Sequence, residues 1–115
     1  MYPAYTDVEK KGKSGKSPYV MCEYDHSMGN STGALKDYWD IIRKYPKYQG
    51  GFIWDFVDQS CHWKNKDGIA IYGYGGDFNK YDASDNNFND NGLISPDRVP
   101  NPHAYEVGSF YQNIW

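Results

Sequence analysis

The sequence predicts an α/β fold in which two parallel strands are joined by a helix. Two short apolar runs, residues 18–24 and 52–57, lack the alternation of a half-exposed strand, so each is expected to be a strand buried on both faces. Between them, apolar residues recur with helical spacing over 35–42. A strand, a loop, a helix and a second strand form a βαβ unit, whose strands pair in parallel.

The elements before the helix are defined by a proline and by polar segments. Residues 7–17 are polar and rich in lysine, and are expected to form a solvated connector or the frayed end of a helix. Pro18 opens the first strand, and the polar segment 25–33 follows it as a loop. Ser31 or Thr32 is expected to cap the helix that comes next.

The helix is the clearest element of the sequence. Its apolar face follows the i, i+3, i+4, i+7 rule at Leu35, Tyr38, Trp39 and Ile42. Its outward face carries a charged row at Lys36, Asp40 and Lys44. Pro46 ends the helix, and Gly50 and Gly51 are expected to turn the chain into the second strand.

Regular patterns weaken after residue 58. Residues 69–72 predict a short strand, and 103–111 predict a last helix. Between them, 73–92 is a long loop rich in Gly, Asp and Asn, and loops of that length in compact proteins tend to be functional. The oxygen-bearing side chains of 77–92 could hold a hard cation.

Charge and cysteine content exclude several classes of protein. With 12 Lys and Arg against 15 Asp and Glu, the formal net charge is -3, which argues against a nucleic-acid partner. No apolar run approaches the roughly 18–20 residues that span a bilayer, and residues 1–5 do not resemble a signal peptide. Cys22 and Cys61 lack metal-site spacing and are expected to be buried thiols. The cellular compartment stays open.

Aromatic residues make up much of the apolar content. The chain has 12 Tyr, 4 Trp and 5 Phe but few aliphatic side chains. Such a composition suits a chain that lines a site or an interface better than one that fills its own core. A self-sufficient domain is therefore not expected.

Several side chains near the strand ends could take part in chemistry. Glu23 lies where the first strand ends, which is where α/β enzymes place working groups, although a carboxylate satisfied by structural partners fits equally. His26 could orient Glu23 or bind a substrate, or could be merely exposed. Trp54 could form a flat floor for a sugar or belong to the core. Asp55 and Asp58 could act as paired carboxylates, but capping of loop amides is favoured.

Four sequence blocks resemble the β-galactosidases of glycoside hydrolase family 2. They are Cys-Glu-Tyr-Asp-His-Ser-Met-Gly-Asn-Ser at 22–31, Gln-Gly-Gly-Phe-Ile-Trp-Asp-Phe-Val-Asp-Gln at 49–59, Gly-Gly-Asp-Phe at 75–78, and Asn-Gly-Leu at 91–93. Their order and spacing match those of the family, and the resemblance spans nearly the whole chain.

This resemblance implies a specific fold. The family's catalytic domain is a (β/α)8 TIM barrel, and residues 1–115 are similar to its C-terminal part, from about strand 6 to strand 8 with the following loops and the last helix. Residues 18–23 resemble the seventh strand and 50–56 the eighth. The chain is therefore expected to be a fragment of the barrel.

The same resemblance implies roles for individual residues. Glu23 matches the catalytic nucleophile of retaining hydrolysis, in which terminal non-reducing β-D-galactosides react through a covalent galactosyl-enzyme. The other matching positions bind substrate, at Tyr2, His26 and Trp54, or a sodium ion, at the Phe88 backbone carbonyl and Asn91.

The chain also departs from the family pattern. The Gly-Asn-Glu-Ser block that carries the acid/base residue is absent, as are the segments that bind Mg²⁺ in the full-length family. The chain alone is therefore expected to be inactive, with the rest of the barrel, and in some cases a second copy, as its partner. Asp25 stands where the family has a small residue and is expected to face the loop. Two alternatives to a catalytic role stay open. One is a non-catalytic fragment that binds carbohydrate or complements another chain, and the other is a structural remnant.

Overall fold

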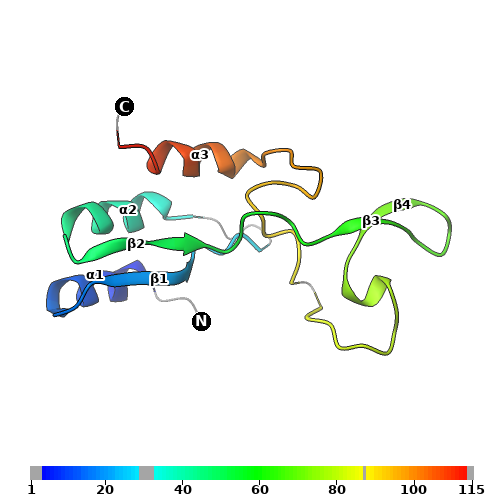
Figure 1. Cartoon of the computed structure of the whole chain (residues 1–115), viewed down its shortest axis with the longest axis horizontal. Coiled ribbons are helices and arrows are strands. Elements are labelled where there is room, and N and C mark those ends of the chain that lie inside the picture. The colour runs from blue at the N-terminus through cyan, green and yellow to red at the C-terminus, as the bar shows by residue number, and fades with distance from the viewer. Residues whose placement is uncertain (1–3, 29–32, 87, 114–115) are drawn as a thin grey trace.

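The computed structural model describes residues 4–28, 33–86 and 88–113. The regular elements in chain order are α1 (Tyr5–Ser14), β1 (Tyr19–Tyr24), α2 (Leu35–Lys44), β2 (Tyr48–Ile53), β3 (Cys61–Lys64), β4 (Ala70–Gly73), the 3₁₀ helix η1 (Gly75–Asp77) and α3 (Pro102–Phe110). They form two separate two-stranded sheets and no closed barrel within these residues (Figure 1). No helix among the described residues is both long and apolar enough to cross a membrane.

The predicted βαβ unit is confirmed. Strands β1 and β2 pair in parallel, with Tyr19 opposite Tyr48 and Tyr24 opposite Ile53, and α2 connects them. The strand bounds differ from the predicted ones, because β2 begins at Tyr48 and ends at Ile53. Gly50 and Gly51, expected to form a turn, lie inside the strand.

The glycines in β2 have a packing reason. Gly50 has a φ of +123°, which favours glycine. A Cβ on Gly51 would stand 3.0 Å from both the Met21 and the Tyr24 side chains, so a hydrogen there lets β1 and β2 approach closely. Sequence patterns predict a turn for this pair because glycine favours both situations.

The helices cover one face of the β1–β2 sheet. Eight buried side chains from α1, both strands, α2 and α3 form the core: Val8, Met21, Tyr24, Leu35, Tyr38, Ile41, Tyr48 and Val107. On β1 the neighbouring Val20 and Cys22 are exposed, so the expectation that the strands are buried on both faces is wrong. The reason is that only one side of this sheet has helices packed against it. Cys61 is also exposed, and neither cysteine is the buried thiol that was expected.

The first segment forms a complete helix where the sequence suggested a connector or a frayed end. Val8 on α1 is fully buried and anchors this otherwise polar helix to the core. At the start of α2 the N-cap position is Ala34, and Ser31 and Thr32, which were expected to cap this helix, lie outside the described residues. The predicted face of α2 is confirmed, with Leu35 and Tyr38 buried.

Beyond the first sheet the chain is extended. Strands β3 and β4 form an antiparallel hairpin that projects away from the helices (Figure 1). The radius of gyration is 17.3 Å, against about 13 Å for a compact domain of this length. Strand β4 and helix α3 confirm the predictions to within about one residue, and the segment between them is mostly irregular. Strand β3 was not predicted, because all four of its side chains are exposed and leave no hydrophobic pattern.

Candidate active site

The candidate site lies at the carboxyl ends of β1 and β2. Glu23 is the penultimate residue of β1 and is half-buried. Trp54 follows the last residue of β2, and its backbone N–H donates to the Tyr24 carbonyl at 3.3 Å. This hydrogen bond places Trp54 beside the residue that follows Glu23. The peptide bond between Trp54 and Asp55 is cis.

Four of the predicted site residues converge here. The His26 and Phe88 rings meet edge to face with centroids 5.2 Å apart, and the Trp54 and Phe88 ring centroids lie 5.9 Å apart. The Asn91 side-chain amide donates to His26 Nε2 at 3.1 Å. Because Nε2 accepts in this arrangement, the proton of a neutral His26 ring is on Nδ1. Tyr2, the remaining predicted substrate contact, lies outside the described residues.

The segment that carries Asn91 is fastened to both strand ends. The Asn91 backbone carbonyl accepts hydrogen bonds from the Ser27 hydroxyl at 2.6 Å and from the Asp55 N–H at 2.9 Å. Asp58 Oδ1 accepts from the Gly92 N–H at 2.6 Å, which confirms the favoured role of Asp58 as a cap of a loop amide. The loop is therefore held in place by bonds that do not use the His26 ring or the Asn91 side chain.

Asp55 is hydrogen-bonded to a neighbouring side chain as well as to backbone. Its Oδ2 accepts a hydrogen bond from the Gln59 side chain. Burial raises the pKa of the Asp55 carboxyl, with the neighbouring Asp58 charge as a further cause, whereas the nearby His26 acts in the opposite direction. The two aspartates are close enough to interact electrostatically, yet Asp58 is engaged by a backbone amide.

Five polar atoms of the site are buried without a hydrogen-bond partner among the described residues. They are Asp25 Oδ2, Trp54 Nε1, Asp55 Oδ1, Gln59 Oε1 and Asn91 Oδ1, and Asn91 is fully buried. Unsatisfied buried polar groups are costly and call for a missing partner such as a ligand, an ion or a water molecule. One N–H donor and four oxygens of the site are therefore without a hydrogen-bond partner among the described residues.

Asp25, directly beyond the end of β1, faces the loop only in part. Its Oδ1 accepts from the Gly33 N–H at 3.3 Å, but the residue is buried, with 7% of its surface exposed. Burial raises the pKa of this carboxyl to about 6. Its φ of +52° is a left-handed conformation that Asp adopts more readily than most residues.

Sequence reasoning missed two contributors to this site. Ser27 holds the Asn91 carbonyl, and only its position inside the 22–31 block pointed to it. The Phe88 ring joins His26 and Trp54, although only its backbone carbonyl had been assigned a role. No metal-binding group of three or more His, Cys, Asp or Glu side chains occurs within the described ranges.

This geometry defines a class: a βαβ unit of an α/β protein with a carboxylate and an aromatic cluster at its carboxyl strand ends. Comparison with known proteins identifies the family within this class. Residues 3–115 match the family model described as glycosyl hydrolases family 2, TIM barrel domain. The chain therefore belongs to glycoside hydrolase family 2, within its TIM barrel domain.

Several similar proteins are named beta-galactosidase. The chain is 47% identical to a beta-galactosidase of Clostridium acetobutylicum over 115 residues, which are 99% of this chain and 13% of that protein. It is 52% identical to a beta-galactosidase of Leuconostoc mesenteroides over 90 residues, 78% of this chain and 9% of the relative. Identity to the beta-galactosidase BgaC of Bifidobacterium adolescentis is 47% over 112 residues, 97% of this chain and 10% of that protein. The chain thus spans only about a tenth of the length of these relatives.

Proposed function

We propose that this chain carries the nucleophile of a retaining β-galactosidase, with Glu23 as the attacking carboxylate. The observation that carries the proposal is the convergence of His26, Trp54, Phe88 and Asn91 beside the end of the strand that bears Glu23. The relatives named beta-galactosidase support a β-galactoside as the substrate.

The proposed reaction has two steps. The Glu23 carboxylate attacks the anomeric carbon while the glycosidic C–O bond breaks, and a second carboxyl group protonates the leaving oxygen. That second group then deprotonates a water molecule, which displaces Glu23 from the sugar. The two carboxyl groups of such a site stand about 5–5.5 Å apart. Because no Gly-Asn-Glu-Ser block occurs in the sequence, the second group is assigned to another part of the enzyme, and these residues alone are proposed to be inactive.

The aromatic cluster is proposed to bind the sugar. Trp54 is half-buried and leans against Phe88 at an interplanar angle of 44°, which suits a platform for the C–H face of a galactosyl ring. The buried Trp54 Nε1–H can donate to a sugar hydroxyl, which would give this group the hydrogen-bond acceptor that it lacks among the described residues. His26 is proposed to contact the sugar hydroxyls or the nucleophile, as is Tyr2 on the basis of the family resemblance.

A sodium ion is proposed to bind next to the sugar site. Asn91 Oδ1 is a buried oxygen without a hydrogen-bond partner among the described residues, and hard cations prefer such oxygen ligands. The Phe88 carbonyl is the second proposed ligand. A bound sodium ion would supply positive charge to a sugar hydroxyl. The family's Mg²⁺ has no ligands assigned in this chain.

Labelling with a 2-deoxy-2-fluoro-galactosyl donor tests the assignment of Glu23. Intact mass is measured for the chain alone and for the chain mixed with a family barrel that lacks this segment. We expect a single sugar adduct on Glu23 in the mixture, its loss in Glu23→Gln, and its retention in the control Glu106→Gln. An adduct on the chain alone would refute the proposed inactivity. If no adduct forms although circular dichroism confirms folding, the assignment of Glu23 as the nucleophile is refuted.

A further inference from the structure

Asn91 and Gly92 form the one Asn–Gly pair of the sequence, and the fold places this pair at the candidate site. In an Asn–Gly pair the peptide nitrogen of the glycine can attack the side-chain amide of the asparagine, which is then deamidated. Glycine favours this attack because it has no side chain to hinder the approach and leaves the backbone free to rotate. The pair is therefore the point of the chain that its sequence makes most prone to deamidation.

Packing leaves no room for another residue at position 92. A Cβ on Gly92 would stand 2.3 Å from the backbone nitrogen of Asp58 and 2.6 Å from the carbonyl carbon of Val57. Asn91 is equally fixed, because its side chain is fully buried and its amide donates to His26 Nε2 at 3.1 Å. The contacts of the fold thus require both members of a chemically labile pair, so the lifetime of the pair depends on how the fold holds it.

The attacking nitrogen is held by a carboxylate. The Gly92 N–H donates to Asp58 Oδ1 at 2.6 Å, in a buried hydrogen bond. Attack on Asn91 Cγ requires that this nitrogen lose its proton and turn toward the side-chain amide. A carboxylate, with a pKa of about 4, is far too weak a base to remove a peptide proton, so the bond keeps the proton on the nitrogen and fixes the direction of the N–H. Asp58 therefore opposes the first step of deamidation.

Groups on both sides of the attacking nitrogen are fixed as well. The Asn91 carbonyl accepts the two hydrogen bonds described above, and the Gly92 carbonyl accepts from Asn101 Nδ2 at 2.9 Å and from His103 Nε2 at 3.1 Å. Rotation of either peptide group would break these bonds, and unpaired buried polar groups are costly. Both residues are also buried away from bulk water. The pair can therefore react only when this segment opens locally.

We propose that Asn91–Gly92 is a deamidation site whose reaction is suppressed by Asp58. When the hydrogen bond to Asp58 opens, the Gly92 nitrogen forms a bond to Asn91 Cγ and the bond between Cγ and Nδ2 breaks. The proton of the attacking nitrogen leaves with Nδ2 as ammonia. A water molecule then opens the cyclic imide at either of its carbonyl groups, which leaves an aspartate or an isoaspartate at position 91. Water is the only co-reactant.

Deamidation would alter the candidate site directly. The product lacks the Nδ2 group that donates to His26, and it places a new negative charge beside the cluster with Trp54 and Phe88. An isoaspartate also lengthens the main chain by a carbon atom, which displaces the segment that follows. The loss of hydrolysis expected from these changes rests on the proposed function, whereas the deamidation itself does not.

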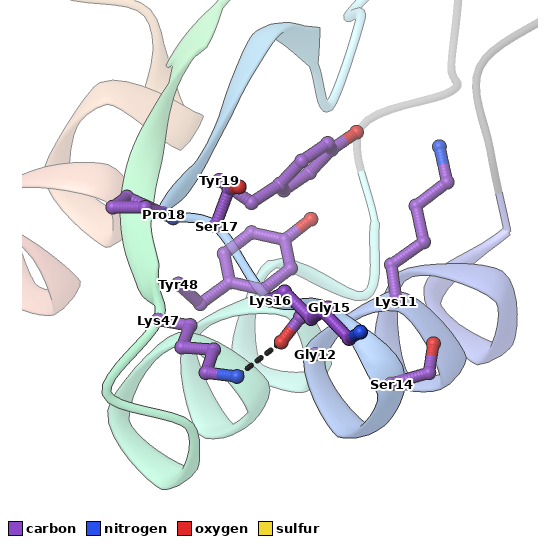
Figure 2. A pocket seen from close by; sticks show the side chains of 10 residues that line it. All are labelled: Lys11, Gly12, Ser14, Gly15, Lys16, Ser17, Pro18, Tyr19, Lys47 and Tyr48. Carbon is purple, nitrogen blue, oxygen red and sulfur yellow. Dashed lines mark hydrogen bonds between the residues drawn. The ribbon is translucent and has the colours of Figure 1, made fainter.

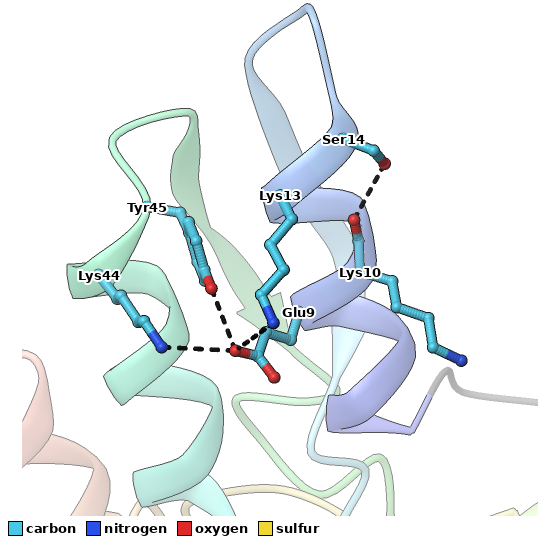
Figure 3. Close-up of polar contacts among 6 residues, drawn as sticks. All are labelled: Glu9, Lys10, Lys13, Ser14, Lys44 and Tyr45. Carbon is cyan, nitrogen blue, oxygen red and sulfur yellow. Dashed lines mark hydrogen bonds and ion pairs between the residues drawn. The ribbon is translucent and has the colours of Figure 1, made fainter.

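The opposite end of the β1–β2 sheet offers a matched control. Figure 2 shows this end, where the last turn of α1 lies beside Tyr19 and Tyr48, the residues that open the two parallel strands. On α1, Glu9 pairs with Lys44 at 3.5 Å and accepts a hydrogen bond from the Tyr45 hydroxyl at 3.0 Å (Figure 3). Glu9→Ala therefore removes a carboxylate that joins two segments, as Asp58→Ala does, but at the end of the sheet away from the labile pair.

The test is mass spectrometry of peptides from the 115-residue chain after incubation in mildly alkaline buffer, with and without guanidinium chloride. Deamidation appears as a gain of about 1 Da in the peptide that contains Asn91, because OH replaces NH₂. We expect the unmodified chain to react at least about tenfold more slowly in buffer than in guanidinium chloride. Asp58→Ala should raise the rate in buffer at least about fivefold and leave the rate in guanidinium chloride unchanged. Asp58→Asn, which keeps a side-chain oxygen as acceptor, should retain most of the protection.

Glu9→Ala should stay within about twofold of the unmodified rate, since it leaves the contacts of the pair intact. Equal acceleration by Glu9→Ala and Asp58→Ala would mean that general stability sets the rate, and would overturn the role of Asp58. Equal rates of the unmodified chain in buffer and in guanidinium chloride, or no reaction at Asn91 in either, would overturn the proposal as a whole. If Asp58→Ala does not fold, hydrogen exchange of the unmodified chain decides. The Gly92 amide should then exchange at least about tenfold more slowly than that of the exposed Gly76, and equal exchange would overturn the protection.

Discussion

Replacing Asp25 by Asn should change the pH dependence of folding. Asp25 is buried at the end of β1, and its Oδ2 has no hydrogen-bond partner within the described ranges. Burial is the main cause that raises the pKa of this carboxyl from 3.8 to about 6, and the charge of Glu106 raises it further. The Gly33 N–H and His103 act in the opposite direction. Asn has almost the same shape and also tolerates the left-handed φ of +52°.

The size of the effect follows from the two pKa values of Asp25. Because its pKa is higher in the folded chain than in the unfolded chain, the folded state holds the proton more tightly. The resulting stabilisation is complete below about pH 4 and is lost as the pH rises through about 6. A difference of roughly 2 pKa units at about 1.4 kcal/mol each corresponds to about 3 kcal/mol. The neutral Asn side chain cannot lose this contribution.

Urea unfolding at pH 4 and at pH 7.5, followed by tryptophan fluorescence, measures this difference. Relative to the unmodified chain, Asp25→Asn should gain about 3 kcal/mol of unfolding free energy between the two pH values. Asp85→Asn, which changes an exposed carboxyl, should show no such gain and controls for net charge. The variant and the unmodified chain will differ in unfolding free energy at each pH. If that difference is the same at pH 4 and at pH 7.5, the reasoning is refuted.

Three further predictions concern packing and exposure. Gly92→Ala should lower the unfolding free energy measured in urea by at least about 3 kcal/mol, because its Cβ would stand 2.3 Å from a backbone nitrogen. Gly76→Ala is the control: its Cβ would have nothing within 4 Å, so the unfolding free energy should change by no more than about 0.5 kcal/mol. Tyr24→Phe should lower the unfolding free energy by about 1–3 kcal/mol, since its buried hydroxyl bonds to a tyrosine at 2.9 Å and a tryptophan at 3.2 Å; an unchanged midpoint would contradict this. Cys22 and Cys61 are exposed, so both should react with Ellman's reagent without denaturant, and a reaction that needs urea would refute their exposure.

Sequence patterns predicted the elements that bury a regular apolar face. Helix α2 was recognisable because Leu35 and Tyr38 recur at helical spacing and are both buried. Helix α1 buries Val8 among polar and charged residues, so hydrophobic periodicity gave it no clear signal. Strand β3 is wholly exposed and depends on its pairing with β4. Such elements depend on partners that are distant in sequence or on polar contacts, which local patterns do not encode.

Family resemblance, more than residue patterns, located the candidate site. From position alone, His26 and Trp54 had ordinary structural interpretations, yet both belong to one cluster with Phe88 and Asn91. Asn91 comes from a segment more than sixty residues after His26, and no spacing rule connects the two. The burial of Asp25 could not be predicted either, because groups that are distant in sequence, such as Glu106 and His103 on α3, lie near its carboxyl.

The tyrosine-rich composition has a structural consequence for the core. Tyrosines take the place of aliphatic side chains in the core, where Tyr24, Tyr38 and Tyr48 are buried. Each buried ring brings a hydroxyl group that needs a partner. The Tyr24 hydroxyl finds one in Tyr111, 2.9 Å away, and accepts a further hydrogen bond from Trp39 Nε1 at 3.2 Å. A core built from tyrosines therefore stabilises the fold where its hydroxyl groups are paired.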